Sequence, residues 1–251
     1  MKKYKIPKQL IYFSGPLIIL IIWKLISYFS LVSSLMLPSP ESVMSVFLSE
    51  IKKGDLLRHV GVSVFRVLMG FGLASVVGIS LGLLMGWFEL ARKFFDSIIE
   101  FLRPIPPIAW IPLAILWFGI GELSKIYLIA YGAFFPIVLN TILGVRSIDR
   151  KLLLLAKSMN LKGFELFKEV ILPASFPSIF AGLRIGLGVG WMCLIAAELI
   201  AAQSGIGYMI EESKMLLLTN RVILGMIIIG FLGFLADRII RLIEKKFVHW
   251  V

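Results

Sequence analysis

Three side chains able to form ion pairs or hydrogen bonds recur at seven-residue intervals in one apolar stretch: Arg184, Trp191 and Glu198. In an α-helix this spacing places them within about 40° of one face, over about 21 Å. Charged residues inside apolar helices usually face a bundle interior or a water-filled cavity. We therefore expect this stripe to line a solute pathway, with Leu187 and Leu194 facing lipid. Snorkelling of the two charged residues from opposite helix ends is the alternative.

A second candidate for the pathway is the proline-rich stretch that contains Arg103, Pro106 and Pro107. Four of the nine residues from 104 to 112 are prolines. Proline removes a backbone donor and clashes with the preceding turn, so this stretch cannot form a regular helix. Inside a membrane, irregular backbone persists only where protein or a water-filled cavity satisfies it. We expect a bend beside a pathway, and a purely structural kink is the alternative.

Residues for catalysis or metal binding are scarce. The only histidines are His59 and His249, and Cys193 is the only cysteine. The sequence therefore predicts no metal site of the Cys/His type and no intramolecular disulfide. It also has no G-x-x-x-x-G-K-[ST] loop to hold nucleotide phosphates. We expect no cofactor and no enzyme activity, so any energy-driven step must draw on a partner or an ion gradient.

The elements that position these residues are membrane helices. Of the 251 residues, 59% are hydrophobic and 16% are charged, whereas soluble domains have about 25% charged residues. This composition excludes a soluble globular protein, and it makes the net charge of +11 a signal of membrane orientation rather than of nucleic-acid binding. We predict an all-α integral membrane protein with one transmembrane domain over residues 1–251. Its six spans are Leu10–Ser30, Val60–Trp87, Ser97–Gly119, Leu123–Gly144, Pro177–Ala202 and Val222–Ile240.

The basic residues between these spans predict the orientation of the chain. Sixteen Lys and Arg residues lie on the side of the N-terminus, six lie on the other side, and four lie inside spans. The side with the excess of basic residues is the cytoplasmic one. Both termini are therefore predicted to be cytoplasmic.

One pattern predicts how the helices pack, and another predicts a short helix on the outer surface. Small residues occur at every fourth position from Gly70 to Gly86, and Gly182, Gly186 and Gly190 repeat this spacing. Such ridges allow close approach of helices in lipid. Between the first two spans, Ser39 and Pro40 begin a short amphipathic helix that ends near Gly54, on the outer surface.

The cytoplasmic connection 146–175 has its own pattern. Asp149 can cap a short helix, and Asn160 suits a left-handed helix stop. A second helix is predicted to run to Pro173 with Phe164, Phe167 and Ile171 on one stripe. Two short helices with an apolar stripe suggest docking into a groove of another protein, and packing onto the inner ends of the chain's own spans is the alternative.

Residues 154–173 resemble the loop of bacterial ABC importer permeases, whose pattern is Glu-Ala-Ala, three residues, Gly, nine residues and Ile-x-Leu-Pro. Leu154 and Asn160 stand where the pattern has Glu and Gly. The segments LPSPESV, SVFRVLMGF, LRPIPPIAWIPLAILWFG, LPASFPSIFAGLRIGLGVGW and AAELIAAQSGIGYMI are similar to the nitrate/sulfonate/taurine-type permeases over about residues 37–240. The residues that align with the named positions of this loop are Leu154, Leu155, Ala156, Asn160, Val170 and Pro173, and the candidate coupling aromatics Phe164 and Phe167 lie between them.

The resemblance implies a type I ABC importer permease in the cell (inner) membrane, with a cytoplasmic coupling-helix loop. It also implies a second copy of the chain, two ABC ATPase subunits and an extracytoplasmic substrate-binding protein as partners. The expected cargo is a small solute such as a sulfonate, nitrate, taurine or a vitamin precursor. The competing functions are an ion-coupled secondary transporter or channel and a non-transporting membrane scaffold.

Overall fold

The computed structural model describes residues 8–248, and side chains from Ser14 onward. This part of the chain is helical and contains no strand. The elements in chain order are α1 (Lys8–Tyr28), α2 (Pro40–Lys53), α3 (Asp55–Trp87), α4 (Glu89–Leu102), the 3₁₀ turn η1 (Pro107–Trp110), α5 (Ile111–Phe118), α6 (Glu122–Arg146), α7 (Arg150–Ser158), α8 (Gly163–Leu166), the π-helical turn η2 (Phe167–Ile171), α9 (Leu172–Ala201), α10 (Ile206–Met215) and α11 (Thr219–Phe247).

Four described helices are long and apolar enough to cross a membrane: α3, α6, α11 and the continuous helical segment Gly163–Ala201. The bent pair of α4 with η1 and α5 makes a fifth span if it is counted as one. The described part of α1 adds a shorter apolar helix, Ser14–Tyr28. The all-α membrane fold is confirmed, but helix length and composition alone do not reach the predicted count of six in the described chain.

The third predicted span, Ser97–Gly119, is bent, as its prolines predicted. α4 ends at Leu102, and the two arms on either side of the break are bent by 86°. The break covers residues 103–106 and includes Pro104 and Pro106, which lack backbone donors. Gly119, with φ of 73°, then ends α5. The sequence predicted this bend, and the structure places it between α4 and η1.

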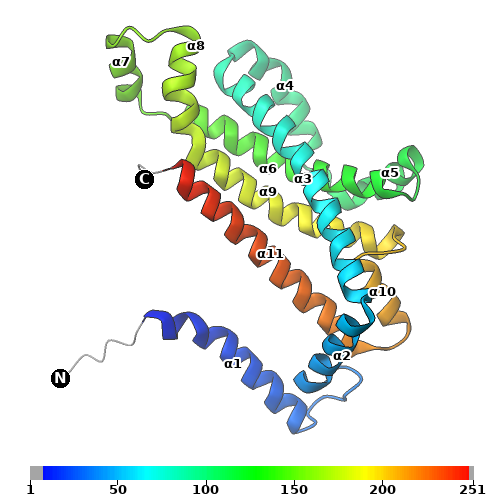
Figure 1. The fold of residues 1–251 in the computed structure, drawn as a ribbon. Coiled ribbons are helices and arrows are strands. Elements are labelled where there is room, and N and C mark those ends of the chain that lie inside the picture. Colours follow the sequence, from blue (N-terminus) through cyan, green and yellow to red (C-terminus); the bar gives the residue numbers. More distant parts are fainter. Residues whose placement is uncertain (1–7, 249–251) are drawn as a thin grey trace, which may run out of the picture.

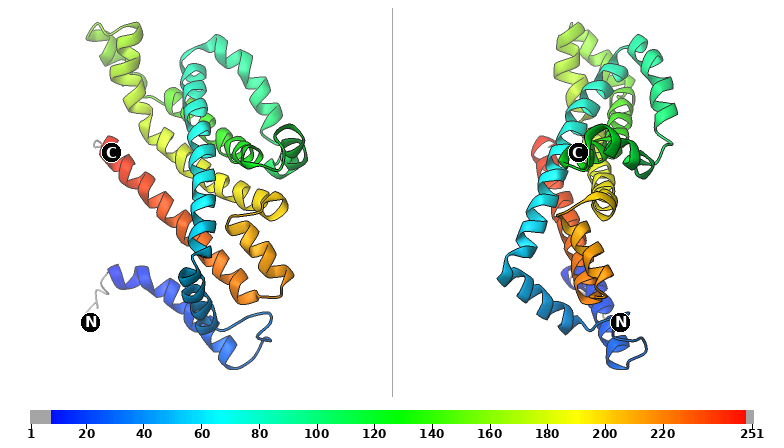
Figure 2. Two further views of the ribbon diagram at one scale, coloured as in Figure 1. Left: turned by 45° about the vertical axis from the view of Figure 1, so that its right-hand side comes forward. Right: turned by 90° about the vertical axis from the view of Figure 1, so that its right-hand side faces the viewer.

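The helices α3, α6 and α9 form the centre of the bundle (Figures 1 and 2). The small-residue ridge of α3 faces α6: a Cβ atom on Gly78 would lie 3.0 Å from Ile137 Cγ2. On α9, a Cβ atom added to Gly186 would lie 2.8 Å from Cγ1 of the same Ile137. The packing that the glycine spacing predicted is therefore present, and it joins three helices in close contact.

The two ends of the bundle carry different elements. α7 and α8 project at one end, beside the turn between α3 and α4, whereas α2 and α10 lie at the opposite end (Figures 1 and 2). α2 begins as predicted, because Ser39 Oγ accepts a hydrogen bond from the Ser42 backbone N–H, and it ends at Gly54 with φ of 81°.

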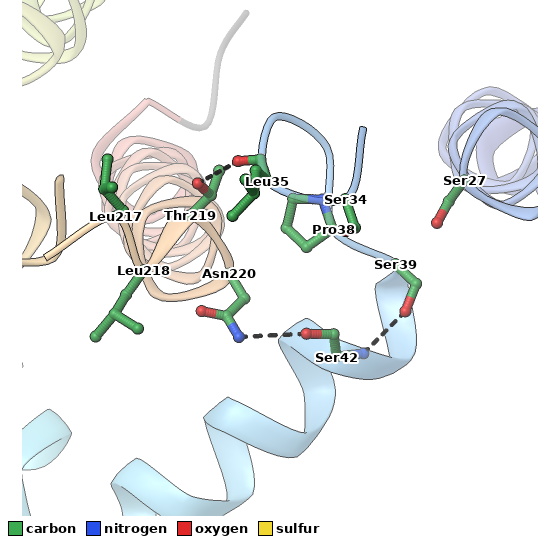
Figure 3. A pocket seen from close by; sticks show the side chains of 10 residues that line it. All are labelled: Ser27, Ser34, Leu35, Pro38, Ser39, Ser42, Leu217, Leu218, Thr219 and Asn220. Carbon is green, nitrogen blue, oxygen red and sulfur yellow. Dashed lines mark hydrogen bonds between the residues drawn. The ribbon is translucent and has the colours of Figure 1, made fainter. Parts of the chain in front are cut away.

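The segment between α1 and α2 is fastened to the start of α11 (Figure 3). Thr219 Oγ1 donates to the Leu35 carbonyl at 2.6 Å, and Asn220 Nδ2 donates to Ser42 Oγ at 3.2 Å. These bonds border a hollow of about 350 Å³ whose lining combines four serines and Thr219 with apolar side chains. Inter-element hydrogen bonds thus hold this end of the molecule together.

Candidate functional site

A buried polar cluster joins α3, α6, α9 and the turn that leads to α10. At its centre lies Arg66, whose side chain is 1% exposed. Arg66 Nη1 donates to Glu198 Oε1 and to the Ser204 carbonyl, both at 2.7 Å. Its Nε and Nη2 donate to the two carboxylate oxygens of Glu122, both at 2.6 Å. The guanidinium is thus bonded to two carboxylates that come from different helices.

Glu198 is held by neutral donors as well. Ser63 Oγ lies 2.8 Å from its Oε1, and the Gly207 backbone N–H donates to its Oε2 at 2.8 Å. A Cβ atom on Gly207 would lie 2.6 Å from Glu198 Cβ, so glycine permits this close approach. The carboxylate is therefore fully enclosed, with its lone pairs satisfied, as a buried charge requires.

Local sequence explains why these groups meet. His59, Ser63 and Arg66 occupy positions i, i+4 and i+7 of α3, which share one helix face. His59 Nδ1 accepts a hydrogen bond from the Gly205 backbone N–H at 3.0 Å. Three polar residues at helical spacing inside an apolar helix predict such a cluster, but Arg66 entered the prediction only as one of the four basic residues inside spans.

The stripe Arg184, Trp191 and Glu198 divides between three environments. Glu198 belongs to the buried cluster, and Trp191 packs in the apolar core with Leu187, Leu194 and Ile240. Arg184 pairs with Asp237 of α11 at 3.0 Å. All three contact other helices of the same chain, and a role in the pathway stays a prediction.

The expectation that Leu187 and Leu194 face lipid is wrong. Leu194 is 0% exposed and Leu187 is also buried. The exposed side of α9 instead carries Ile185 and Met192, the latter 73% exposed. Apolarity alone could not separate these faces, since in a membrane protein the core and the lipid-facing surface are both apolar.

The proline-rich residues border an open groove of about 360 Å³ between the bent segment, α6 and α9. Arg103 and Pro107 line it, together with Tyr131, Asn140 and Ile185. Pro106 precedes η1 with extended backbone and ends the break. The structure thus brings two of the predicted pathway residues to a groove that Arg184, Trp191 and Glu198 do not line.

The predicted helix cap and helix stop in the connection 146–175 are both confirmed. Asp149 Oδ1 accepts from the Lys151 N–H at 2.8 Å and caps α7. Asn160 has φ of 61°, and the Leu161 N–H donates to the Ala156 carbonyl, which closes the helix end. The second helix does not end at Pro173, however. It continues through the π-helical turn η2 into α9, and Pro173 lies directly after this turn.

The coupling residues divide between an exposed and a packed set. Phe164 is 76% exposed, whereas Phe167 contacts Trp87 with ring centroids 5.7 Å apart and Ile171 is buried. A groove of about 540 Å³ lies between α8 and the end of α3. Of the remaining predicted residues, Leu154 and Leu155 are exposed, Ala156 is buried, and Val170 and Pro173 are half-buried.

Packing on the chain's own spans, the alternative for this loop, therefore holds for Phe167 and Ile171. Leu154 and Leu155 stay exposed, and Phe164 stacks on Phe167 with ring centroids 6.4 Å apart but keeps most of its surface exposed. Together these leave an exposed apolar surface at the end of the molecule that carries α7 and α8.

Comparisons with known proteins identify the family to which this chain belongs. The family described as binding-protein-dependent transport system inner membrane component matches residues 74–249. The chain belongs to this family. It is the permease subunit of an importer of the ABC class, in the nitrate/sulfonate/taurine group.

Two relatives and one solved structure illustrate the similarity. SsuC of Bacillus subtilis, named for aliphatic sulfonates transport, is 40% identical over 94% of this chain and 85% of its own. The taurine transport system permease protein TauC of Escherichia coli is 36% identical over 93% of this chain and 86% of its own. A chain of the MetNI methionine ABC transporter, in inward-facing conformations, shares the fold of the permease with a TM-score of 0.61 and 20% identity, covering 74% of this chain and 94% of that chain.

Proposed function

We propose that the permease imports a small organic sulfonate across the cell (inner) membrane, with energy from a separate ATPase subunit. The observation that carries the proposal is the similarity to SsuC and TauC, each of which covers more than nine-tenths of this chain. Their names refer to aliphatic sulfonates and to taurine, and taurine is itself a sulfonate. An extracytoplasmic binding protein would deliver the solute, as the family description implies.

The groove at Arg103 suits one wall of the pathway. It combines a cationic group and the Asn140 amide with the apolar side chains of Phe135 and Val189. A mostly apolar cavity with a few polar groups is typical of small-molecule sites. The groove is open on one side. The exposed Ile185 of α9 lines it, and the exposed Met192 lies two turns further along α9. A second copy of the chain, placed against this face, would close it.

The ATPase is expected at the exposed apolar surface of Leu154, Leu155 and Phe164. Both termini would then lie on the same, cytoplasmic side, in agreement with the distribution of basic residues. Because α8, η2 and α9 form one continuous helical segment, Gly163–Ala201, movement of the coupling residues would act directly on the span that borders the groove.

Reconstitution tests this function. The permease is purified with its ATPase and placed in proteoliposomes with the binding protein inside or outside, and uptake of labelled taurine, methanesulfonate and nitrate is measured. We expect ATP-dependent uptake of at least one sulfonate and two permease copies per complex by native mass spectrometry. Uptake that follows an ion gradient without ATP would contradict the proposal.

A further inference from the structure

The ion pair between Arg66 and Glu122 joins two side chains of very different exposure. The Arg66 side chain is 1% exposed and that of Glu122 is 50% exposed. The second carboxylate partner, Glu198, is fully buried. One carboxylate is therefore fixed inside the bundle, whereas the other borders the surface.

The exposed partner occupies the edge of the guanidinium best suited to an oxyanion. Arg66 Nε and Nη2 make two parallel hydrogen bonds, each 2.6 Å long, to the two oxygens of Glu122. This bidentate arrangement recognises two oxygen atoms of one anionic group. A sulfonate or nitrate presents two oxygens in the same way. We propose that Arg66 is an oxyanion-binding residue and that the Glu122 carboxylate is an internal occupant which an anionic solute displaces.

Charge balance in the cluster favours such an exchange. Arg66 and the buried Lys125 are matched by Glu122 and Glu198, so the four groups sum to zero. If the Glu122 carboxylate rotates into solvent, a buried excess of one positive charge remains, and an unpaired buried charge is costly. A bound monovalent oxyanion removes that excess, whereas a neutral or cationic solute cannot.

The exchange requires only a side-chain rotation. Glu122 is the first residue of α6, and the turn before it is held by other groups. Lys125 Nζ donates to the Ile120 and Gly121 carbonyls at 2.7 and 3.0 Å, and Ser124 Oγ donates to the Gly121 carbonyl at 2.9 Å. The backbone can therefore stay in place while the exposed carboxylate leaves the guanidinium.

This site rests on the proposed function, since its ligand is an anionic solute of the kind imported. Binding of methanesulfonate and nitrate to the purified permease and ATPase complex, without binding protein, is measured by calorimetry at constant ionic strength against chloride. We expect Kd to fall in the order wild type, Glu122→Gln, Glu122→Ala, by about tenfold over the series, because the internal competitor is weakened and then removed. Glu41→Ala is the control, since Glu41 is also an exposed carboxylate paired with a basic residue, Lys24.

Arg66→Lys in the Glu122→Ala background should abolish the gain, because lysine keeps a positive charge beside Glu198 but lacks the two-nitrogen edge. If that variant fails to fold, the Glu122 series alone decides. A Kd that is the same in wild type and both Glu122 variants, or that shifts equally in Glu41→Ala, overturns the site even when uptake is normal. A lower unfolding temperature of the Glu122 variants with unchanged Kd would make the ion pair structural only and equally overturn it. Absence of any sulfonate uptake by the wild-type complex would instead overturn the proposed function.

Discussion

Arg66 Nη1 on α3 lies 2.7 Å from Glu198 Oε1 on α9, although 132 positions separate the two residues in the chain. Both side chains are almost completely buried, and the pair fixes the end of α9 to α3 beside the start of α6. The pair also anchors the turn to α10 through the Ser204 carbonyl. Because a buried charge depends on its partner, the two residues have to be considered together.

Truncation of either member should destabilise the permease. We expect Arg66→Ala to cost about 3–5 kcal/mol, because it leaves Glu198 buried without its cationic partner, and Glu198→Ala to cost less, because Arg66 keeps its pair with Glu122. The double variant Arg66→Leu with Glu198→Leu should lose less than the sum of the single changes. Thermal unfolding in detergent checks this. Arg58→Ala is the control, since Arg58 is exposed on the same helix; equal losses for Arg58 and Arg66 would contradict the assignment.

The close contact of α3 with α6 predicts a position-specific effect of a single methyl group. A Cβ atom on Gly82 would lie 2.5 Å from Thr141 Cβ, whereas one on Gly72 would meet nothing within 4 Å. Gly82→Ala should therefore lower stability by about 1–3 kcal/mol, and Gly72→Ala should not. Unfolding temperatures of the two variants, which differ only in position on one helix, measure the difference. Identical values would mean that α3 and α6 are not packed this closely.

Several features could be predicted from the sequence because their causes are local. The caps at Ser39 and Asp149 and the left-handed Asn160 follow from the residues themselves. The Arg66 and Glu198 pair could not be predicted, since no local period connects residues on separate helices. The prediction that Leu194 faces lipid was wrong because hydrophobic residues are equally suited to the core and to the lipid-facing surface.

The left-handed backbone conformation of Asn160 allows the loop geometry to be tested by substitution. Its φ of 61° is accessible to Asn and Gly but strained for a β-branched residue. Asn160→Gly should keep wild-type assembly, whereas Asn160→Val should cost about 1–2 kcal/mol and displace the start of α8. Co-purification of the ATPase with each variant reports the effect. Equal recovery with Val and Gly would show that this stop does not position the coupling segment.

Labelling of single cysteines tests the corrected orientation of α9. If the exposed side of α9 borders the pathway, as proposed, a cysteine in place of Met192 in a Cys193→Ala background should react with a small water-soluble thiol reagent, and its reactivity should change when ATP and vanadate are added. A cysteine in place of the buried Leu194 should not react. Rapid labelling at position 194 would contradict the packing of α9 described above.

The coupling of ATP hydrolysis to transport provides the most direct test. Phe164 is exposed and available to the ATPase, whereas Phe167 is packed on Trp87. Alanine substitutions at the two positions should therefore have different effects. The measurement is binding-protein-stimulated ATP hydrolysis and sulfonate uptake in proteoliposomes. We predict that Phe164→Ala weakens ATPase assembly, by about 2 kcal/mol or more if it is a hot spot, at unchanged unfolding temperature, and that Phe167→Ala lowers that temperature as well. Wild-type assembly, hydrolysis and uptake in Phe164→Ala would contradict the proposal that this surface links the permease to its ATPase.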